Sequence, residues 1–126
     1  MIVGLEAILV STQSARKLGS FYEDIVGLKK TMEMEIGEKG ELAISFALGK
    51  GPGLYILDHS QVKGKNANAS RIMFNLEVDD IEREVKRMKK KKVKIVKDIY
   101  HMQDYGFVAT FADTDGNYFQ FVKTRE

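Results

Sequence analysis

The chain carries the same order of strand and helix signals twice, and this repetition limits the folds open to it. In the first half, an apolar, β-rich run covers residues 3–10. Apolar residues at helical spacing follow, with Ser14 as a capping residue and Gly27 as a stop. Three further strands are then predicted, over residues 29–36, 41–48 and 54–57. The first half therefore has the order β-α-β-β-β.

The second half repeats this order after a polar stretch. Asp79 and Glu82 form a predicted capping box, and the spacing of Ile81, Val85 and Met88 predicts a helix. Strands are predicted before and after this helix, over residues 71–78, 93–99, 107–112 and 118–122. The second half is thus also β-α-β-β-β.

The repeat predicts an α+β fold made of two βαβββ modules in one domain that covers residues 1–126. The modules are expected at about residues 1–59 and 70–126, with a linker at about 60–69. With 44% apolar residues the chain has enough apolar side chains for one hydrophobic core. Each module alone, however, is too small to bury a face of its own sheet. We therefore expect the modules to lie side by side, forming a curved mixed sheet around a concave cavity with the helices outside.

Composition excludes several classes of function. The net charge is +2, there is no cysteine, and no apolar run is long enough for a membrane span. The first residues do not resemble a signal peptide, so we expect a cytoplasmic protein. The basic run at residues 86–94 has no interleaved aromatic residues and suits a solvated helix C-terminus. We expect neither a nucleic-acid nor a membrane partner.

The stretch Asp113-Thr114-Asp115-Gly116-Asn117 provides the flexible backbone of a tight hairpin between two apolar strands. It resembles the Asp-Pro-Asp-Gly-Asn hairpin of the vicinal oxygen chelate superfamily, which includes glyoxalase I, bleomycin-resistance proteins and extradiol dioxygenases. The opening of the superfamily, Ser-x-x-Phe-Tyr-x-x-x-x-Gly-Leu, is similar to residues 18–28 here, and its strand-to-helix junction is similar to residues 78–82. The resemblance covers nearly the whole chain and implies the fold expected from the repeat.

In metalloenzymes of that superfamily, four strand positions supply His, Gln or Glu ligands to a divalent ion. The matching positions here are Ala7, Ile56 (or Tyr55 if the register differs by one), Met73 and Gln120. Alanine and isoleucine have no lone pairs, and a thioether suits soft ions only. Gln120 offers a single neutral oxygen. We therefore expect no metal and no other cofactor, and no catalytic residue can be assigned.

The leading hypothesis is a homodimeric protein that holds a small, partly apolar molecule in its cavity, as the resemblance to bleomycin-resistance proteins implies. Asn75 and Gln120 are expected to hydrogen-bond this ligand, because buried amides need partners. The full set of candidate ligand-binding residues is Leu9, Tyr55, Met73, Asn75, Glu77, Tyr118 and Gln120.

Two alternatives stay open. The chain could be a lyase, isomerase or dioxygenase-type enzyme with a rearranged site that uses Glu77, Gln120 and His101. Against this, both histidines, His59 and His101, are predicted in exposed loops without a second ligand at metal spacing. The other alternative is a non-catalytic interaction module whose cavity is filled by large side chains, namely Phe46, Tyr55, Phe107 and Tyr118.

Overall fold

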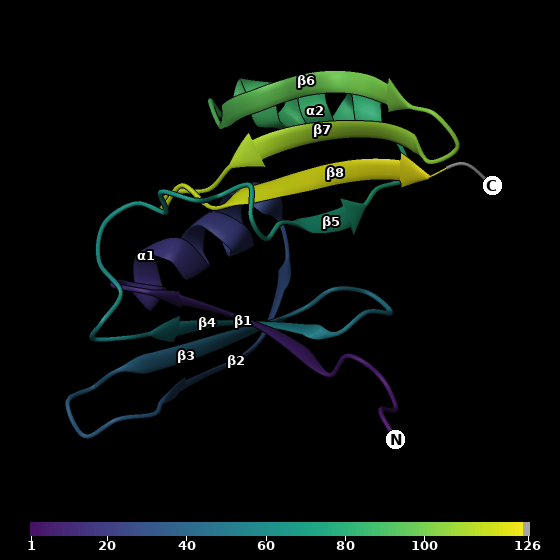
Figure 1. Cartoon of the computed structure of the whole chain (residues 1–126). Coiled ribbons are helices and arrows are strands. Elements are labelled where there is room, and N and C mark those ends of the chain that lie inside the picture. Colours follow the sequence, from purple (N-terminus) through teal and green to yellow (C-terminus); the bar gives the residue numbers. More distant parts are fainter. Residues whose placement is uncertain (125–126) are drawn as a thin grey trace. The chain divides into compact units, whose positions relative to one another are not determined.

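The computed structural model describes residues 1–124 and falls into two compact units, Met1–Gly64 and Lys65–Glu126. Each unit has the order βαβββ and forms its own four-stranded mixed sheet (Figure 1). The boundary between the units lies inside the polar stretch predicted as the linker. The two modules expected from the repeat are confirmed.

The first unit consists of β1 (Ala7–Thr12), α1 (Ala15–Ser20), the π-helical segment η1 (Phe21–Val26), β2 (Lys29–Glu35), β3 (Leu42–Ala47) and β4 (Gly53–Asp58). Its sheet has the order β1-β4-β3-β2, in which β1 pairs with β4 in parallel and the other pairs are antiparallel.

The ends of the first helix agree with the prediction, whereas the first strand does not. Ser14 Oγ accepts the backbone N–H of Lys17 at 3.2 Å, and Gly27 ends η1 with φ of +94°. The strand predicted over residues 3–10 begins only at Ala7, because its partner β4 begins at Gly53, the residue that pairs with Ala7. A strand without a partner has no ladder to join.

The two faces of the first sheet differ in what covers them. Ile44 pairs with Ile56, and a Cβ at Gly19 of α1 would lie 2.9 Å from Cδ1 of Ile44. Helix α1 therefore covers the face that carries these two isoleucines. Because side chains alternate along a strand, Tyr55 points to the opposite face. The face away from α1 is called here the open face of the first sheet.

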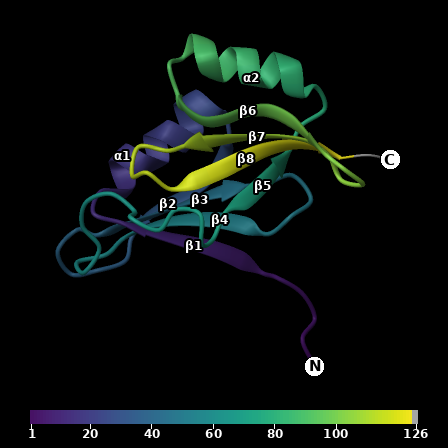
Figure 2. The same cartoon turned by 45° about the horizontal axis from the view of Figure 1, so that its top comes forward.

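The second unit consists of β5 (Phe74–Glu77), α2 (Ile81–Lys90), β6 (Lys94–Met102), β7 (Gly106–Ala112) and β8 (Tyr118–Thr124). The sheet order is β5-β8-β7-β6, and α2 lies along one face of this sheet (Figure 2). The predicted helix stripe of Ile81, Val85 and Met88 is buried. The cap is Asp80 and not Asp79, since Asp80 Oδ1 accepts the N–H of Arg83 at 3.1 Å.

The phenylalanines of the second sheet lie on the side of α2. Phe111 pairs with Phe119, and the two rings stack with centroids 5.7 Å apart. Lys89 of α2 forms an ion pair with Asp98 at 2.7 Å, which places α2 on the side of Asp98. Lys97 pairs with Thr110, and because side chains alternate along a strand, the next residue, Asp98, points to the face of Phe111. The side away from α2 is the open face of the second sheet.

The hairpin between β7 and β8 is closed by one buried carboxylate. Asp113 Oδ1 accepts the backbone N–H groups of Asp115 and Asn117, both at 2.9 Å, and Gly116 has φ of +79°. The turn predicted from Asp113 to Asn117 is therefore present. Within residues 1–124, no helix is long and apolar enough to cross a membrane.

Candidate functional site

The main polar feature of the second unit is a line of hydrogen-bonded side chains on its open face. Thr110 on β7 donates from its hydroxyl to Oε1 of Gln120 on β8 at 2.6 Å. Gln120 donates from Nε2 to Oδ1 of Asn75 on β5 at 2.8 Å. Asn75 donates from Nδ2 to the Tyr105 hydroxyl at 2.9 Å. Thr110, Gln120, Asn75 and Tyr105 are called here the amide line.

The register of the sheet produces most of this line. Asn75 pairs with Gln120, and Gln120 pairs with Thr110, so the three side chains stand in one row across the strands. Tyr105 comes from the turn between β6 and β7, and reaches Asn75 on the far side of β8. Its side chain therefore extends across the open face toward the amides.

The direction of these bonds determines what the amide line can offer to a ligand. Both amide oxygens accept a hydrogen bond from the protein itself, from Thr110 and from Gln120. The Tyr105 oxygen accepts from Asn75, which leaves its own proton as a donor. The amides of Asn75 and Gln120 thus pair with one another and do not depend on a ligand, unlike the arrangement expected from the sequence.

Glu77 is a carboxylate on the same open face. It is exposed, and its Oε2 accepts the hydroxyl of Thr124 at 3.1 Å. Glu77 pairs with Val122, two positions along β8 from Gln120. Tyr118 lies two positions from Gln120 in the other direction and is half-buried. Met73 lies just before β5 and is 39% exposed.

Two candidate residues belong to the first unit. Leu9 pairs with Tyr55, and both side chains stand on the open face of the first sheet. Leu9 is 62% exposed, a large value for a leucine within a strand. Ala7 shares this face with Leu9, since the two are separated by two positions in β1.

The four positions matched to the metal ligands of the superfamily do not share the same orientation. Ile56 is fully buried against α1, so the position on the open face is Tyr55, the second of the two registers considered. Gln120 lies on the open face with its oxygen engaged by Thr110. Among residues 1–124, no three His, Cys, Asp or Glu side chains gather closely enough to hold a metal ion.

His101 differs from its predicted location. It lies in β6 and not in a loop, where it pairs with Phe107, and the two rings lie 5.1 Å apart. Because Phe107 and Phe111 are on the same side of β7, His101 points away from the open face that carries Glu77 and Gln120. The enzyme hypothesis therefore loses this histidine as a neighbour of those two residues.

The residues proposed to fill a cavity are also divided between faces. Phe46 is 1% exposed and pairs with Leu54 on the side of α1, and Phe107 lies on the side of α2. Only Tyr55 and Tyr118 stand on open faces. The set of four large side chains predicted to line one concave surface was therefore wrong for two of its members.

Sequence reasoning missed two members of the amide line. Thr110 had a usable signal, because a tight turn from Asp113 to Asn117 pairs Ala112 with Tyr118 and therefore Thr110 with Gln120. Tyr105 had no such signal, since its contact with Asn75 joins residues 30 positions apart through the packing of the sheet.

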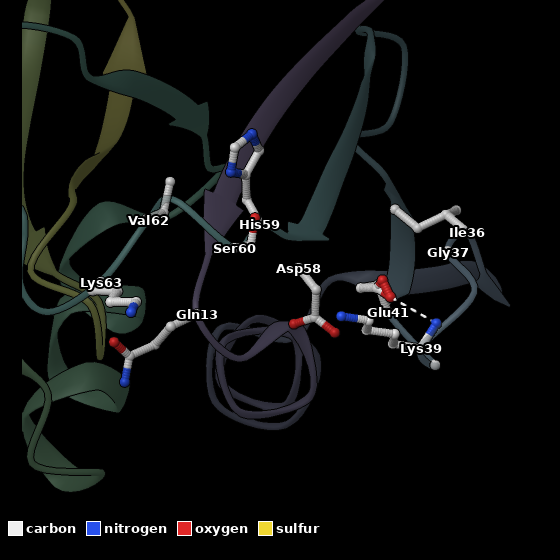
Figure 3. A pocket seen from close by; sticks show the side chains of 11 residues that line it. Gln13, Ile36, Gly37, Lys39, Glu41, Asp58, His59, Ser60, Val62 and Lys63 are labelled. Atoms are coloured by element: carbon white, nitrogen blue, oxygen red, sulfur yellow. Dashed lines mark hydrogen bonds between the residues drawn. The ribbon is translucent and has the colours of Figure 1, made fainter.

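Among residues 1–124, two pockets that lie away from the amide line can be described. One, of about 800 Å³, is at the end of β4 in the first unit, and its side chains are drawn in Figure 3. The other, of about 520 Å³, lies in the second unit between residues 66–71 and Tyr118. Neither pocket is lined by Asn75, Gln120 or Tyr105.

Comparison with known proteins places these observations in a class. The family model for the Glyoxalase/Bleomycin resistance protein/Dioxygenase superfamily matches residues 4–121. The chain belongs to this superfamily. No curated protein matches the sequence.

Solved structures agree on the fold. A glyoxylase/bleomycin resistance protein/dioxygenase domain from Frankia sp. EAN1pec is 13% identical, with a TM-score of 0.80 and coverage of 99% of this chain and 100% of its own. Glyoxalase I of Leishmania major is 19% identical, with a TM-score of 0.74 and coverage of 93% and 84%. TnmS3, an antibiotic binding protein from Streptomyces sp. CB03234, is 19% identical, with a TM-score of 0.73 and coverage of 98% and 98%.

Proposed function

We propose that this chain binds a small, partly apolar molecule on the open face of its second sheet, without the divalent metal of its metalloenzyme relatives. The observation that carries the proposal is the amide line. Among residues 1–124, the Tyr105 hydroxyl proton and the second N–H of each amide have no hydrogen-bond acceptor, and they lie next to apolar strand positions. A ligand with carbonyl or other acceptor oxygens suits these donors.

The donor chemistry argues against a metal of the superfamily type. Ala7 has no lone pair, Tyr55 occupies the position on β4, and Met73 offers only a thioether. The oxygen of Gln120 already accepts a short hydrogen bond from Thr110. These groups do not fit an ion that requires several hard oxygen or nitrogen ligands. TnmS3 is named as an antibiotic binding protein, which is compatible with the fold serving for binding alone.

Exposed apolar side chains on the first sheet favour a homodimer. Leu9, Met32 and Met34 are exposed on β1 and β2, at 62%, 40% and 46%. Exposed large apolar side chains in one sheet suit a face that is covered by a partner or a ligand. Analytical ultracentrifugation should give twice the mass of one chain. A monomer at micromolar concentration would contradict this part of the proposal.

The binding proposal is tested by native mass spectrometry of the protein after incubation with a small-molecule extract. The wild-type protein is expected to retain a non-covalent adduct of low mass, and the double variant Asn75→Leu/Gln120→Leu is expected to lose it. The matched control is Gln61→Leu/Asn68→Leu, which changes the same residue types in exposed segments outside the sheets. An adduct that survives in the first variant, or no adduct in the wild type, contradicts the proposal.

The enzyme alternative now depends on Glu77, the carboxylate on the open face beside the amide line. It requires either a bound metal or a placed general base. Elemental analysis is expected to show no divalent ion in stoichiometric amount. An ion present at one per chain in the wild type and lost in Gln120→Leu would favour the enzyme over the binding protein.

A further inference from the structure

The pocket at the end of β4 is separate from the amide line and is not explained by it. It has a volume of about 800 Å³, within the range of small-molecule sites, and lies entirely in the first unit. Its walls are the turn between β2 and β3, the end of β4 and the segment that follows it (Figure 3). The lining side chains that carry the argument are Gln13, Ile36, Lys39, His59, Val62 and Lys63.

Both carboxylates of this pocket accept hydrogen bonds from backbone N–H groups, Asp58 with two oxygens and Glu41 with one. Asp58 Oδ1 accepts the N–H of Ala15 at 2.6 Å, and its Oδ2 accepts the N–H of Leu42 at 2.9 Å. Glu41 Oε1 accepts the N–H of Lys39 at 3.0 Å. A Cβ at Gly37 would overlap the Glu41 carboxylate, so this carboxylate is folded back onto its own hairpin. Both acidic groups therefore serve the backbone of the pocket.

Gln13 and His59 also have their acceptor atoms occupied by backbone N–H groups. Gln13 Oε1 accepts the N–H of Gly64 at 2.8 Å, which leaves the amide nitrogen of Gln13 as the polar atom available to a ligand. His59 Nδ1 accepts the N–H of Gln61 at 3.1 Å, so the ring proton lies on Nε2. Both side chains thus offer donors.

Two ammonium groups complete the set of donors. Lys39 lies on the β2–β3 side of the pocket and Lys63 on the opposite side, next to Gln13, with Asp58 between them (Figure 3). No side-chain hydrogen bond or ion pair involves either lysine among the contacts of residues 1–124. Ile36 and Val62 add an apolar surface, and Ile36 is 51% exposed.

We propose that this pocket binds a small organic anion that spans it, with a carboxylate or phosphate group held by Lys63 and the Gln13 amide on one side, and with Lys39 and His59 Nε2 as further donors on the walls of the pocket. The apolar body of the anion would lie against Ile36 and Val62. The acceptor atoms described above already bind backbone N–H groups, whereas the donor groups of the pocket are open. A ligand that supplies acceptor oxygens is therefore favoured. The volume exceeds that of a simple inorganic ion, which is why the proposal specifies an organic one.

The test is a titration of the ¹⁵N-labelled protein followed by two-dimensional NMR, with phenyl phosphate, phenylacetate and benzyl alcohol as probes. The two anions are expected to give saturable shifts of backbone amides at residues 36–41 and 59–63, and benzyl alcohol is expected to give none at the same concentrations. Tighter binding of phenyl phosphate indicates a phosphate ligand, and tighter binding of phenylacetate a carboxylate. Shifts that map elsewhere, or equal binding of benzyl alcohol, overturn the proposal.

Charge-matched variants separate this site from general attraction to a basic protein. Lys39→Gln/Lys63→Gln is expected to weaken binding of the preferred anion about tenfold. Lys17→Gln/Lys50→Gln removes the same charge from exposed positions of the same unit outside the pocket, and is expected to leave binding within about twofold. Equal losses in the two variants overturn the proposal. The spectra of both variants also report directly whether the first unit remains folded.

Discussion

Gln120 donates a hydrogen bond to Asn75 across the parallel pair β8–β5, at 2.8 Å between Nε2 and Oδ1. Gln120 is one of the four positions matched to metal ligands of the superfamily, and here both ends of its amide are hydrogen-bonded, the nitrogen to Asn75 and the oxygen to Thr110. The residue therefore contributes to a hydrogen-bonded row across the sheet.

Gln120→Leu is expected to lower the free energy of unfolding by about 1–3 kcal/mol, because the buried hydroxyl of Thr110 loses its acceptor. Urea denaturation measures this change. In the double variant Gln120→Leu/Thr110→Val the orphaned hydroxyl is absent, so the combined loss should be smaller than the sum of the two single losses. Additive losses would show that the two side chains do not interact as the structure indicates.

Thr114→Val is expected to raise the free energy of unfolding by about 1 kcal/mol. The hydroxyl oxygen of Thr114 is buried without a hydrogen-bond partner among residues 1–124, and valine removes this oxygen at nearly constant volume. Thr110→Val is the matched comparison, because it removes a hydroxyl that is hydrogen-bonded. Opposite signs for the two variants in thermal or urea unfolding support this prediction, and a loss of stability in Thr114→Val contradicts it.

Asp58→Asn is expected to lower the free energy of unfolding by about 1–3 kcal/mol. In the wild type, the two carboxylate oxygens accept the N–H groups of Ala15 and Leu42, whereas asparagine has only one side-chain oxygen that can accept. Hydrogen exchange should accelerate at these two amides in particular. Glu38→Gln, in the exposed β2–β3 turn, is the control for the loss of one negative charge. Equal effects of the two variants would mean that Asp58 acts only through its charge.

The ion pair between Lys89 and Asp98 predicts a dependence of stability on pH. The hydrogen bond from Lys89, followed by the N–H of Ile99, holds the pKa of Asp98 below its ordinary value of 3.8. A lowered pKa in the folded state adds stability above the unfolded pKa, and this contribution is lost as the pH falls through the folded pKa. The stability difference between wild type and Asp98→Asn should therefore shrink below about pH 4. A constant difference down to pH 2 contradicts the assignment.

Much of the fold follows from local sequence. The cap at Ser14, the stop at Gly27 and the turn from Asp113 to Asn117 each depend on a few neighbouring residues, and all three are present. The prediction of the first strand was inaccurate, because where a strand begins depends on its partner: Ala7 is the first residue of β1 with a neighbour, at Gly53 of β4. The cap at Asp80 differs from the prediction by one residue.

The chain by itself determined the repeated βαβββ order and the types of residue at the candidate positions, because alternation and helical spacing are encoded within a few residues. Only the tertiary structure decided which face each residue occupies. Neighbouring residues of a strand point to opposite faces of the sheet, so an error of one position in the predicted register changes the face. Tyr55 and Ile56 therefore lie on opposite faces of the first sheet, and His101 and Glu77 on opposite faces of the second. It also brought Tyr105 to Asn75, a contact that depends on the pairing of strands distant in the sequence.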